Sequence, residues 1–403
     1  MAPKLGDIEV SERVCGSQIR TEMLRGGQDF ACYLDKIDGL RKELNCGDDV
    51  QLDPLHFLAT LDDGWHSCAV ACWDGDRLIA VVYAIEHFVH GLRTGYAFGG
   101  DYCGRGMLLC RPSHEVAVVQ ASIERIMAGG IHSLHLRYLP TDSSRPEMAG
   151  KKMMFIEGPI DGDRMRLLLS FDEFLGTLGK HTRRNVRSYM RKAHAEGIEF
   201  VPSLTKAEYQ AGVERLNAES AFPVKQARLA RDERLLALHH NSQRFGLRAA
   251  DGQLVSVLSG FTRAGRFYLL MQHNDVRFND LSLSMVLRGH CVQHLIGSGH
   301  TELQFMGGSS PMFSRYCVPQ KYRSISIDRK TGATTIAKRV FSKVVELVGR
   351  NGRAIPDIVQ TLCGGYLEER RLVERTALQS DEVVQRASSR SDSRTPVEVE
   401  SAS

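Results

Sequence analysis

Two stretches of the chain repeat the same order of strand and helix signals, and this repeat constrains the fold more than any other feature. The first stretch reads "DGDRLIAVVYAI" from Asp74, then "RTGYAFGGD", "SHEVAVVQASIERIMAGG" and "SLHLRYLP". The second reads "DGQLVSVLSGF" from Asp251, then "GRFYLLMQHN", "SLSMVLRGHCVQHLIGSG" and "TELQFMGG". Asp-Gly pairs mark turns, and the spacing of apolar residues marks strands and helices. The repeat predicts an α/β chain of two tandem units, each with a mixed β-sheet flanked by helices.

Boundary signals support these helices. Ser113 and Ser282 are predicted N-caps, and Gly129 and Gly297 are predicted helix stops. A capping box for a further short helix is indicated by Ser170, which is followed at the third position by a glutamate.

The chain is divided on these signals. Residues 1–170 are predicted to form the first unit, with "KMMFIEGPI" and "RMRLLLS" as its closing strands, and residues 171–332 the second. Residues 333–384 carry apolar positions at helical spacing and are predicted to form a helical extension. Residues 385–403 are rich in Ser and Arg and poor in large apolar residues, which predicts a disordered tail.

Composition limits the classes of function. The 403 residues include 52 Lys and Arg against 48 Asp and Glu, so the net charge of +4 lacks the strong field of a general nucleic-acid binder. Ten scattered cysteines show no metal-binding spacing, which indicates a reduced, cytoplasmic chain without a metal. The start lacks the apolar run of a secretory signal, and no apolar run is long enough for membrane insertion.

A basic stretch, "GKHTRRNVRSYMRKAHAEGIEF", lies between the two repeats. If Thr182 caps a helix that Gly197 stops, four arginines fall within an arc of about 100°, opposite an apolar face. Arginine suits bidentate binding of phosphate or carboxylate, whereas a solvated helix face is the simpler interpretation. A nucleic-acid interface would need more aromatic platforms than this stretch offers. The arginines concerned are Arg183, Arg184, Arg187 and Arg191.

The stretch "FDEFLGTLGKHTRRNVRSYMRKAHAEGIEF" resembles the opening of the catalytic half of the CelD-type acyltransferases. These belong to the GNAT (acyl-CoA N-acyltransferase) superfamily and are related to the FemAB aminoacyltransferases. "DGQLVSVLSGF", "GRFYLLMQHN" and "GSGHTELQFMGGSSPMF" resemble later family segments, and "GGDYCGRGMLL" resembles a motif of the degenerate N-terminal GNAT-like unit. The chain departs from the family at Pro311, where the usual Pro-Tyr-Lys is absent, and it lacks the glycine-rich phosphate loop.

The resemblance implies N- or O-acyl transfer from an acyl-CoA, with acetyl-CoA the expected donor. The acceptor would be an amine or hydroxyl of a sugar, a polysaccharide precursor or a small metabolite. FemAB-like aminoacyl transfer from charged tRNA is one alternative, in which the arginines would contact the tRNA. A non-catalytic binding or regulatory module linked to exopolysaccharide biosynthesis is the other. The oligomeric state stays open.

Candidate residues follow from this chemistry. Acyl transfer to an amine needs a general base, for which His273 and Asp275 are the candidates, and Tyr316 is a candidate acid. The start of the helix near Ser282 and Ser284, together with the four arginines, is the candidate site for the donor's phosphates. The alternative roles are a strand end for His273, a turn for Asp275, a core aromatic for Tyr316 and an ordinary cap for the serines. A loop with Asp101, Tyr102 and Arg105 either contacts substrate or is a simple turn.

Overall fold

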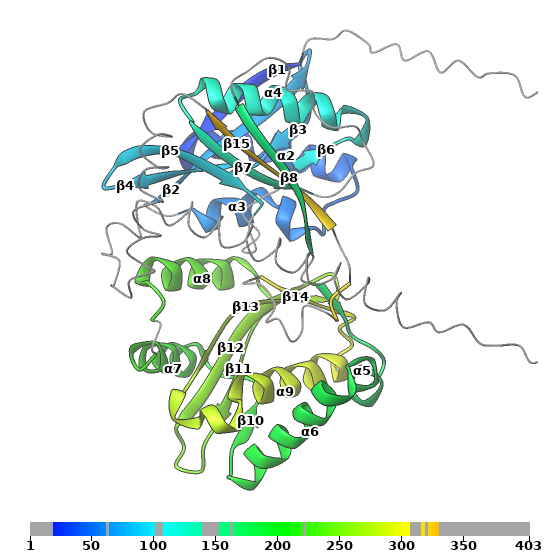
Figure 1. Ribbon diagram of the computed structural model, residues 1–403, viewed down its shortest axis with the longest axis vertical. Coiled ribbons are helices and arrows are strands. Elements are labelled where there is room, and N and C mark those ends of the chain that lie inside the picture. Colours follow the sequence, from blue (N-terminus) through cyan, green and yellow to red (C-terminus); the bar gives the residue numbers. More distant parts are fainter. Residues whose placement is uncertain are drawn as a thin grey trace, which may run out of the picture.

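The chain folds into two α/β units (Figure 1), and the computed structural model describes residues 19–61, 64–100, 108–138, 153–161, 164–220, 223–306, 316–318 and 321–329. Four sequence predictions concern segments outside these residues. They are the loop at Asp101–Arg105, the turn at Pro311–Arg315, the helical extension over 333–384 and the tail over 385–403.

The first unit is built on a nine-stranded mixed sheet in the order β6-β3-β2-β4-β5-β7-β15-β8, with β1 paired to β2. Apolar side chains fill both faces of its central strands, so the sheet is covered on both sides. The strands are β1 (Arg20–Arg25), β2 (Trp65–Asp74), β3 (Arg77–Val82), β4 (Ile85–Val89), β5 (Leu92–Gly99), β6 (Leu108–Cys110), β7 (Ser133–Tyr138), β8 (Met153–Asp161) and β15 (Lys321–Arg329).

The second unit is built on a six-stranded sheet in the order β10-β11-β12-β13-β14-β9. β13 and β14 are parallel, and every other neighbouring pair is antiparallel. The strands are β9 (Arg164–Arg166), β10 (Glu199–Val201), β11 (Ser242–Arg248), β12 (Leu254–Arg263), β13 (Arg266–Asn274) and β14 (Glu302–Phe305).

Two strands join a different sheet from the one that their place in the sequence suggests. The "RMR" segment, expected to close the first unit, forms β9 and pairs with β14 in the second sheet. β15 follows the second repeat but inserts between β7 and β8 of the first sheet. Residues 164–306 are therefore a unit inserted into the first, because pairing partners rather than chain order decide which sheet a strand joins.

Helices cover both faces of each sheet. In the first unit α4 packs on one face and α1 to α3 on the other. In the second unit α5, α6 and α9 pack on one face and α7 and α8 on the other. The helices are α1 (Gly26–Ala31), α2 (Leu34–Glu43), η1 (Val50–Leu52), α3 (Pro54–Thr60), η2 (Pro112–His114), α4 (Glu115–Ala128), α5 (Phe171–Thr177), α6 (Lys180–Ala195), α7 (Lys206–Ala218), α8 (Gln226–Leu238), η3 (Val276–Leu281) and α9 (Leu283–Gly297).

The predicted repeat is confirmed in the order strand, helix, strand, but its first strand was wrong in the first unit: the segment from Asp74 forms β3, which pairs with β2 and β6, whereas β5 pairs with β4. In each unit an antiparallel strand pair is followed by a helix and by a strand parallel to the second member of the pair, as β4-β5-α4-β7 and β12-β13-α9-β14. The predicted class, two tandem α/β units with mixed sheets flanked by helices, is therefore confirmed.

The predicted helix boundaries hold only in part. The Ser170 capping box is present and Gly129 is the C-cap of α4. Ser113 lies in η2 and caps nothing, since His114 is the N-cap of α4. The cap predicted at Thr182 was wrong because α6 already begins at Lys180. Thr182 is instead buried inside the helix.

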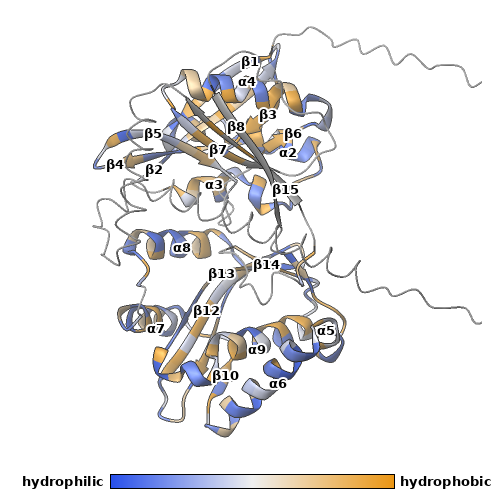
Figure 2. Ribbon diagram, in the orientation of Figure 1, coloured by the Kyte–Doolittle hydropathy of each residue, from blue (hydrophilic) through white to orange (hydrophobic). Residues whose placement is uncertain are grey.

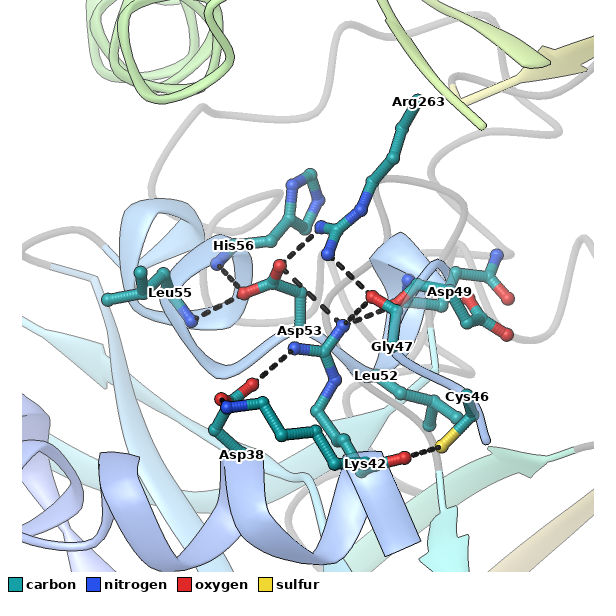
Figure 3. Close-up of polar contacts among 12 residues, drawn as sticks. Asp38, Lys42, Cys46, Gly47, Asp49, Leu52, Asp53, Leu55, His56 and Arg263 are labelled. Atoms are coloured by element: carbon teal, nitrogen blue, oxygen red, sulfur yellow. Dashed lines mark hydrogen bonds and ion pairs between the residues drawn. The ribbon is translucent and has the colours of Figure 1, made fainter. Parts of the chain in front are cut away.

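The two units meet through α3 and α8, which face each other between the sheets (Figure 1). Arg263, at the end of β12, donates to the Asp53 carboxylate and to the Gly47 carbonyl of the first unit (Figure 3). Nδ1 of His56 lies 3.1 Å from Nε2 of His239 across the same interface. Burial, with the neighbouring His56, lowers the pKa of His239 to about 3, so the His239 ring is neutral at ordinary pH.

Candidate functional site

The second sheet has a bulge in β13. Ser259 pairs with Met271 and Gly260 pairs with Leu269, so Leu270 is an extra residue on β13. The parallel pairing with β14 ends at the same place, at Leu269, whose carbonyl accepts a last hydrogen bond of 2.9 Å from Met306 N–H. Within the part of the chain that the structure describes, β13 then continues to Asn274 with only β12 beside it.

Gly260 is required opposite this bulge. A Cβ atom built on Gly260 would lie 2.3 Å from the carbonyl oxygen of Tyr268 and 2.4 Å from Cζ of Phe267. The first contact is with backbone, which cannot rotate away. The close approach of the two strands at the bulge therefore depends on the missing side chain.

The start of α9 lies beyond the end of β13. Ser282 has φ 49° and ψ 53°, the left-handed conformation, and its side chain makes no capping hydrogen bond. The amide N–H groups of Leu283 and Ser284 belong to the first helical turn, where the helix itself supplies no acceptor. Ser282 is thus the N-cap by position, as predicted, and α9 presents N–H groups of the kind that bind anions.

A cavity of about 120 Å³ lies on the opposite face of the sheet, between α7, α8 and β13. Met271, the residue after the bulge, forms part of its wall. Tyr209 also lines it and donates a 2.7 Å hydrogen bond to Ser259, across from Met271 in the sheet. Polar and acidic residues of α7 and α8 also line the cavity, namely Gln210, Glu214, Gln226, Asp232 and Glu233.

His273 lies on this cavity face. It pairs with Val257, a residue of the core under α7 and α8, and directly paired residues share a face. Its Nε2 contacts the sulfur of Met271. Burial, together with the positive charge of Arg228, lowers the pKa of His273, so the imidazole is neutral at pH 7.

Asp275 occupies the turn between β13 and η3 and is the N-cap of η3. Its buried carboxylate accepts hydrogen bonds from the backbone and side chain of Arg277, and from Arg215 at 3.4 Å. The Arg277 side chain, helped by the other donors and opposed by burial, holds the pKa of Asp275 at about 2. The geometry is that of an ion-paired turn.

Tyr316 lies on the other face of the sheet from His273. Its hydroxyl accepts a 2.9 Å hydrogen bond from Gly179 N–H and lies 3.2 Å from the Thr182 hydroxyl, at the start of α6. Its ring packs against the core shared by α5, α6 and α9. The structure therefore does not bring the predicted acid and the predicted base together.

The arginines of α6 point away from α9. Val186 and Met190 face Gly289 of α9, where a Cβ would lie 2.9 Å from the Met190 sulfur. Arg184, Arg187 and Arg191 are exposed and Arg183 is half-buried. The predicted division of α6 into an apolar face and a basic face is confirmed.

Two residues next to the bulge were not predicted. Gln272 donates to the Ser284 carbonyl of α9 at 3.3 Å, and its own carbonyl accepts a 2.8 Å hydrogen bond from Nε of Arg288. The Arg288 guanidinium lies 5.7 Å from the ring centre of Phe305 on β14. Arg288 therefore contacts both β13 and β14 at the point where these strands separate. The sequence signal that could have identified Arg288 is that α9 contains no other Lys, Arg, Asp or Glu.

The described residues contain no group of three or more His, Cys, Asp or Glu side chains able to hold a metal ion. Their helices include none with the length and apolar character needed to cross a membrane. The seven cysteines among them are free thiols.

Comparison with known families gives a match in the second unit. Residues 180–316 match the family model described as an acetyltransferase (GNAT) domain. No curated protein matches the sequence.

Solved structures give only remote likenesses. L-PGS from Bacillus licheniformis is 13% identical over 75% of this chain and 94% of its own, with a TM-score of 0.46. A tandem GNAT protein from the clavulanic acid biosynthesis pathway is 11% identical over 78% of this chain and 100% of its own, with a TM-score of 0.45. FemX is 11% identical over 76% of this chain and 96% of its own, with a TM-score of 0.41. At such values the likeness assigns no substrate.

Proposed function

We propose that the second unit transfers an acyl group from an acyl-CoA thioester at the bulge of β13, because residues 180–316 match the family model of an acetyltransferase (GNAT) domain. The observation that carries the proposal is the coincidence of three features at one point. β13 leaves β14 there, α9 begins just beyond it, and a cavity opens on the opposite face.

The donor would lie along the outer edge of β13. On the side away from β12, the main-chain groups of residues 270–274 have no strand beside them among the described residues, so they can pair with the amides of an extended donor arm. The first-turn N–H groups of Leu283 and Ser284 would bind its phosphates, where the helix dipole favours negative charge. The residues present fit such a donor without a glycine-rich loop.

The acceptor would enter from the cavity between α7 and α8. His273, neutral and next to Met271, is the residue we assign as general base, since a neutral imidazole can accept the acceptor's proton. Asp275 stays ionised and bound to two arginines, so we assign it the positioning of the turn before α9. Tyr316 as acid remains a prediction.

The test adds one negative charge at the start of α9. Ser284→Asp should leave the fold as stable as before or more so, because an acidic residue in the first turn stabilises a helix by about 0.3–1 kcal/mol. The same charge should repel the donor's phosphates, and we expect the KM for acetyl-CoA to rise roughly tenfold, the factor for about 1.4 kcal/mol of like-charge repulsion. Thiol release measures KM, and thermal unfolding measures stability.

Ser284→Asn is the matched control, since it has the same shape without the charge, and its KM should stay within about threefold of the unmodified chain. If Asp and Asn change the KM equally, the donor's phosphates do not bind at this helix end. If no compound of an acyl-CoA panel is turned over or stabilises the chain against heat, the proposed function itself is wrong.

The finer assignments remain proposals. The sugar or polysaccharide-precursor acceptor, the CelD-type membership and the cytoplasmic location rest on the sequence resemblance and composition. The free thiols are in keeping with a reducing compartment.

A further inference from the structure

An exposed pair of leucines stands between β9 and α5. Leu167 is buried in the core, but Leu168 is 38% exposed and Leu169 is 95% exposed. Leu169 directly precedes the N-cap Ser170, the position from which a hydrophobic staple would pack on Phe174. Its exposure shows that it does not do so. Leu169 is thus a large apolar side chain that the fold leaves in water.

The same region carries most of the chain's excess positive charge. Residues 166–192 hold seven Lys or Arg and two Asp or Glu, a net charge of +5, whereas the whole chain has a net charge of +4. α6 itself contains no acidic residue. Figure 2 shows this helix as largely hydrophilic beside the more hydrophobic α9.

An ion pair links the leucines to the basic helix. Nη2 of Arg187, in the middle of α6, lies 2.7 Å from the Asp172 carboxylate, three residues after Leu169. Since three residues span at most about 11 Å, the leucine pair emerges beside the arginines. Asp172 and Glu173 are the acidic residues nearest in sequence to the pair, and Glu173 is engaged in the capping box.

We propose that Leu168, Leu169 and the basic face of α6 together form a docking surface for an anionic lipid membrane. Arginines attract the negatively charged headgroups, and leucines beside them enter the boundary between headgroups and acyl chains. Two cations in the first turn of α6, Lys180 and Arg183, face the unfavourable positive end of the helix dipole, and an anionic surface offsets this. A nucleic acid would satisfy the arginines but not the leucines, and Tyr189, half-buried beside Lys192, is the one aromatic side chain in α6. This surface lies on the membrane, and no helix of the described residues is suited to span it.

The experiment measures co-sedimentation of the full chain with vesicles. One preparation is phosphatidylcholine alone, and the other contains phosphatidylcholine and phosphatidylglycerol at about three to one. The chain should bind the anionic vesicles and lose that binding as salt is raised, because the screening length shortens. Arg184→Gln with Arg191→Gln should weaken binding roughly 25-fold, about fivefold for each charge.

Leu168→Ala with Leu169→Ala should weaken it by about tenfold, through lost apolar burial. Matched controls lie in the first unit. Leu92→Ala replaces another exposed leucine, 74% exposed, and Arg125→Gln replaces an exposed arginine of α4. Both should bind like the unmodified chain, and circular dichroism should show all variants folded.

Three results would overturn the proposal. The first is equal binding to neutral and anionic vesicles, and the second is equal loss in the test variants and the controls. The third is binding of a single-stranded RNA homopolymer that depends on the arginines alone, with no binding to vesicles, which would make the partner a nucleic acid. None of these outcomes depends on acyl transfer.

Discussion

Replacing Asp275 by Asn separates a structural role of this carboxylate from a catalytic one. The side chain is buried in the turn after β13 and is held by Arg277 and Arg215. Asn keeps the shape and caps a helix about as well as Asp, so the substitution removes the charge with little change in geometry. Any loss of stability therefore reports the ion pairs.

The magnitude follows from the pKa. Hydrogen bonds from the Arg277 side chain, partly opposed by burial, lower the pKa of Asp275 from 3.8 to about 2. Since one pKa unit corresponds to 1.36 kcal/mol, the ionised carboxylate contributes about 2 kcal/mol to the free energy of unfolding. This contribution is complete above pH 4 and is lost as the pH falls through 2, because only the ionised form is stabilised.

Urea unfolding at several pH values is the assay. At pH 7, Asp275→Asn should lower the free energy of unfolding by about 2 kcal/mol, and the difference between the two proteins should shrink between pH 4 and pH 2. The folded variant should still transfer acyl groups, and its rate should fall only if the substitution displaces the start of α9. If the variant is as stable as the unmodified chain at pH 7 but inactive, the carboxylate acts on substrate and the structural argument is wrong.

Two further substitutions test the bulge and the interface. Gly260→Ala should lower the free energy of unfolding by about 3 kcal/mol or more, since its Cβ meets the backbone carbonyl of Tyr268. Gly246→Ala, whose Cβ meets the movable side chains of Leu204 and Leu254, should cost clearly less, and equal losses would contradict the argument. Arg263→Gln should cost about 2 kcal/mol, because Asp53 keeps only the 3.7 Å contact with Arg41 among its described ion pairs. A urea midpoint that does not move would show that this ion pair contributes nothing to the interface.

The sequence predicted the repeat because strand and helix periods and Asp-Gly turns are local signals. It did not predict the bulge at Leu270, since an extra residue in a strand is visible only against its partner. Gly260 offered a hint, because a glycine inside an apolar strand often marks a close approach. The cavity was missed because α7 and α8 carry no motif, and its walls come from segments far apart in the chain.

The site residues show the same limit. His273 was chosen from its place at a strand end, and the structure puts it beside the cavity wall. Asp275 was chosen by the same reasoning, yet Arg215 of α7, 60 positions away, commits it to an ion pair. Tyr316 was chosen because acyl transfer calls for an acid, and it lies on the opposite face of the sheet from His273. Chemical type and strand position locate the region, but side-chain partners decide the role.

The exchange of strands has a consequence for how the units depend on each other. β15 pairs with β7 on one side and β8 on the other, so β8 is held in the first sheet by a strand that follows the entire second unit. The first sheet is therefore complete only when residues 164–306 have already brought the chain back to it. Closing so long a loop is entropically costly, and a compact second unit lowers that cost by keeping its two ends close, at neighbouring strands β9 and β14. The second unit thus stabilises the first through topology as well as through the contacts of Arg263 and α8.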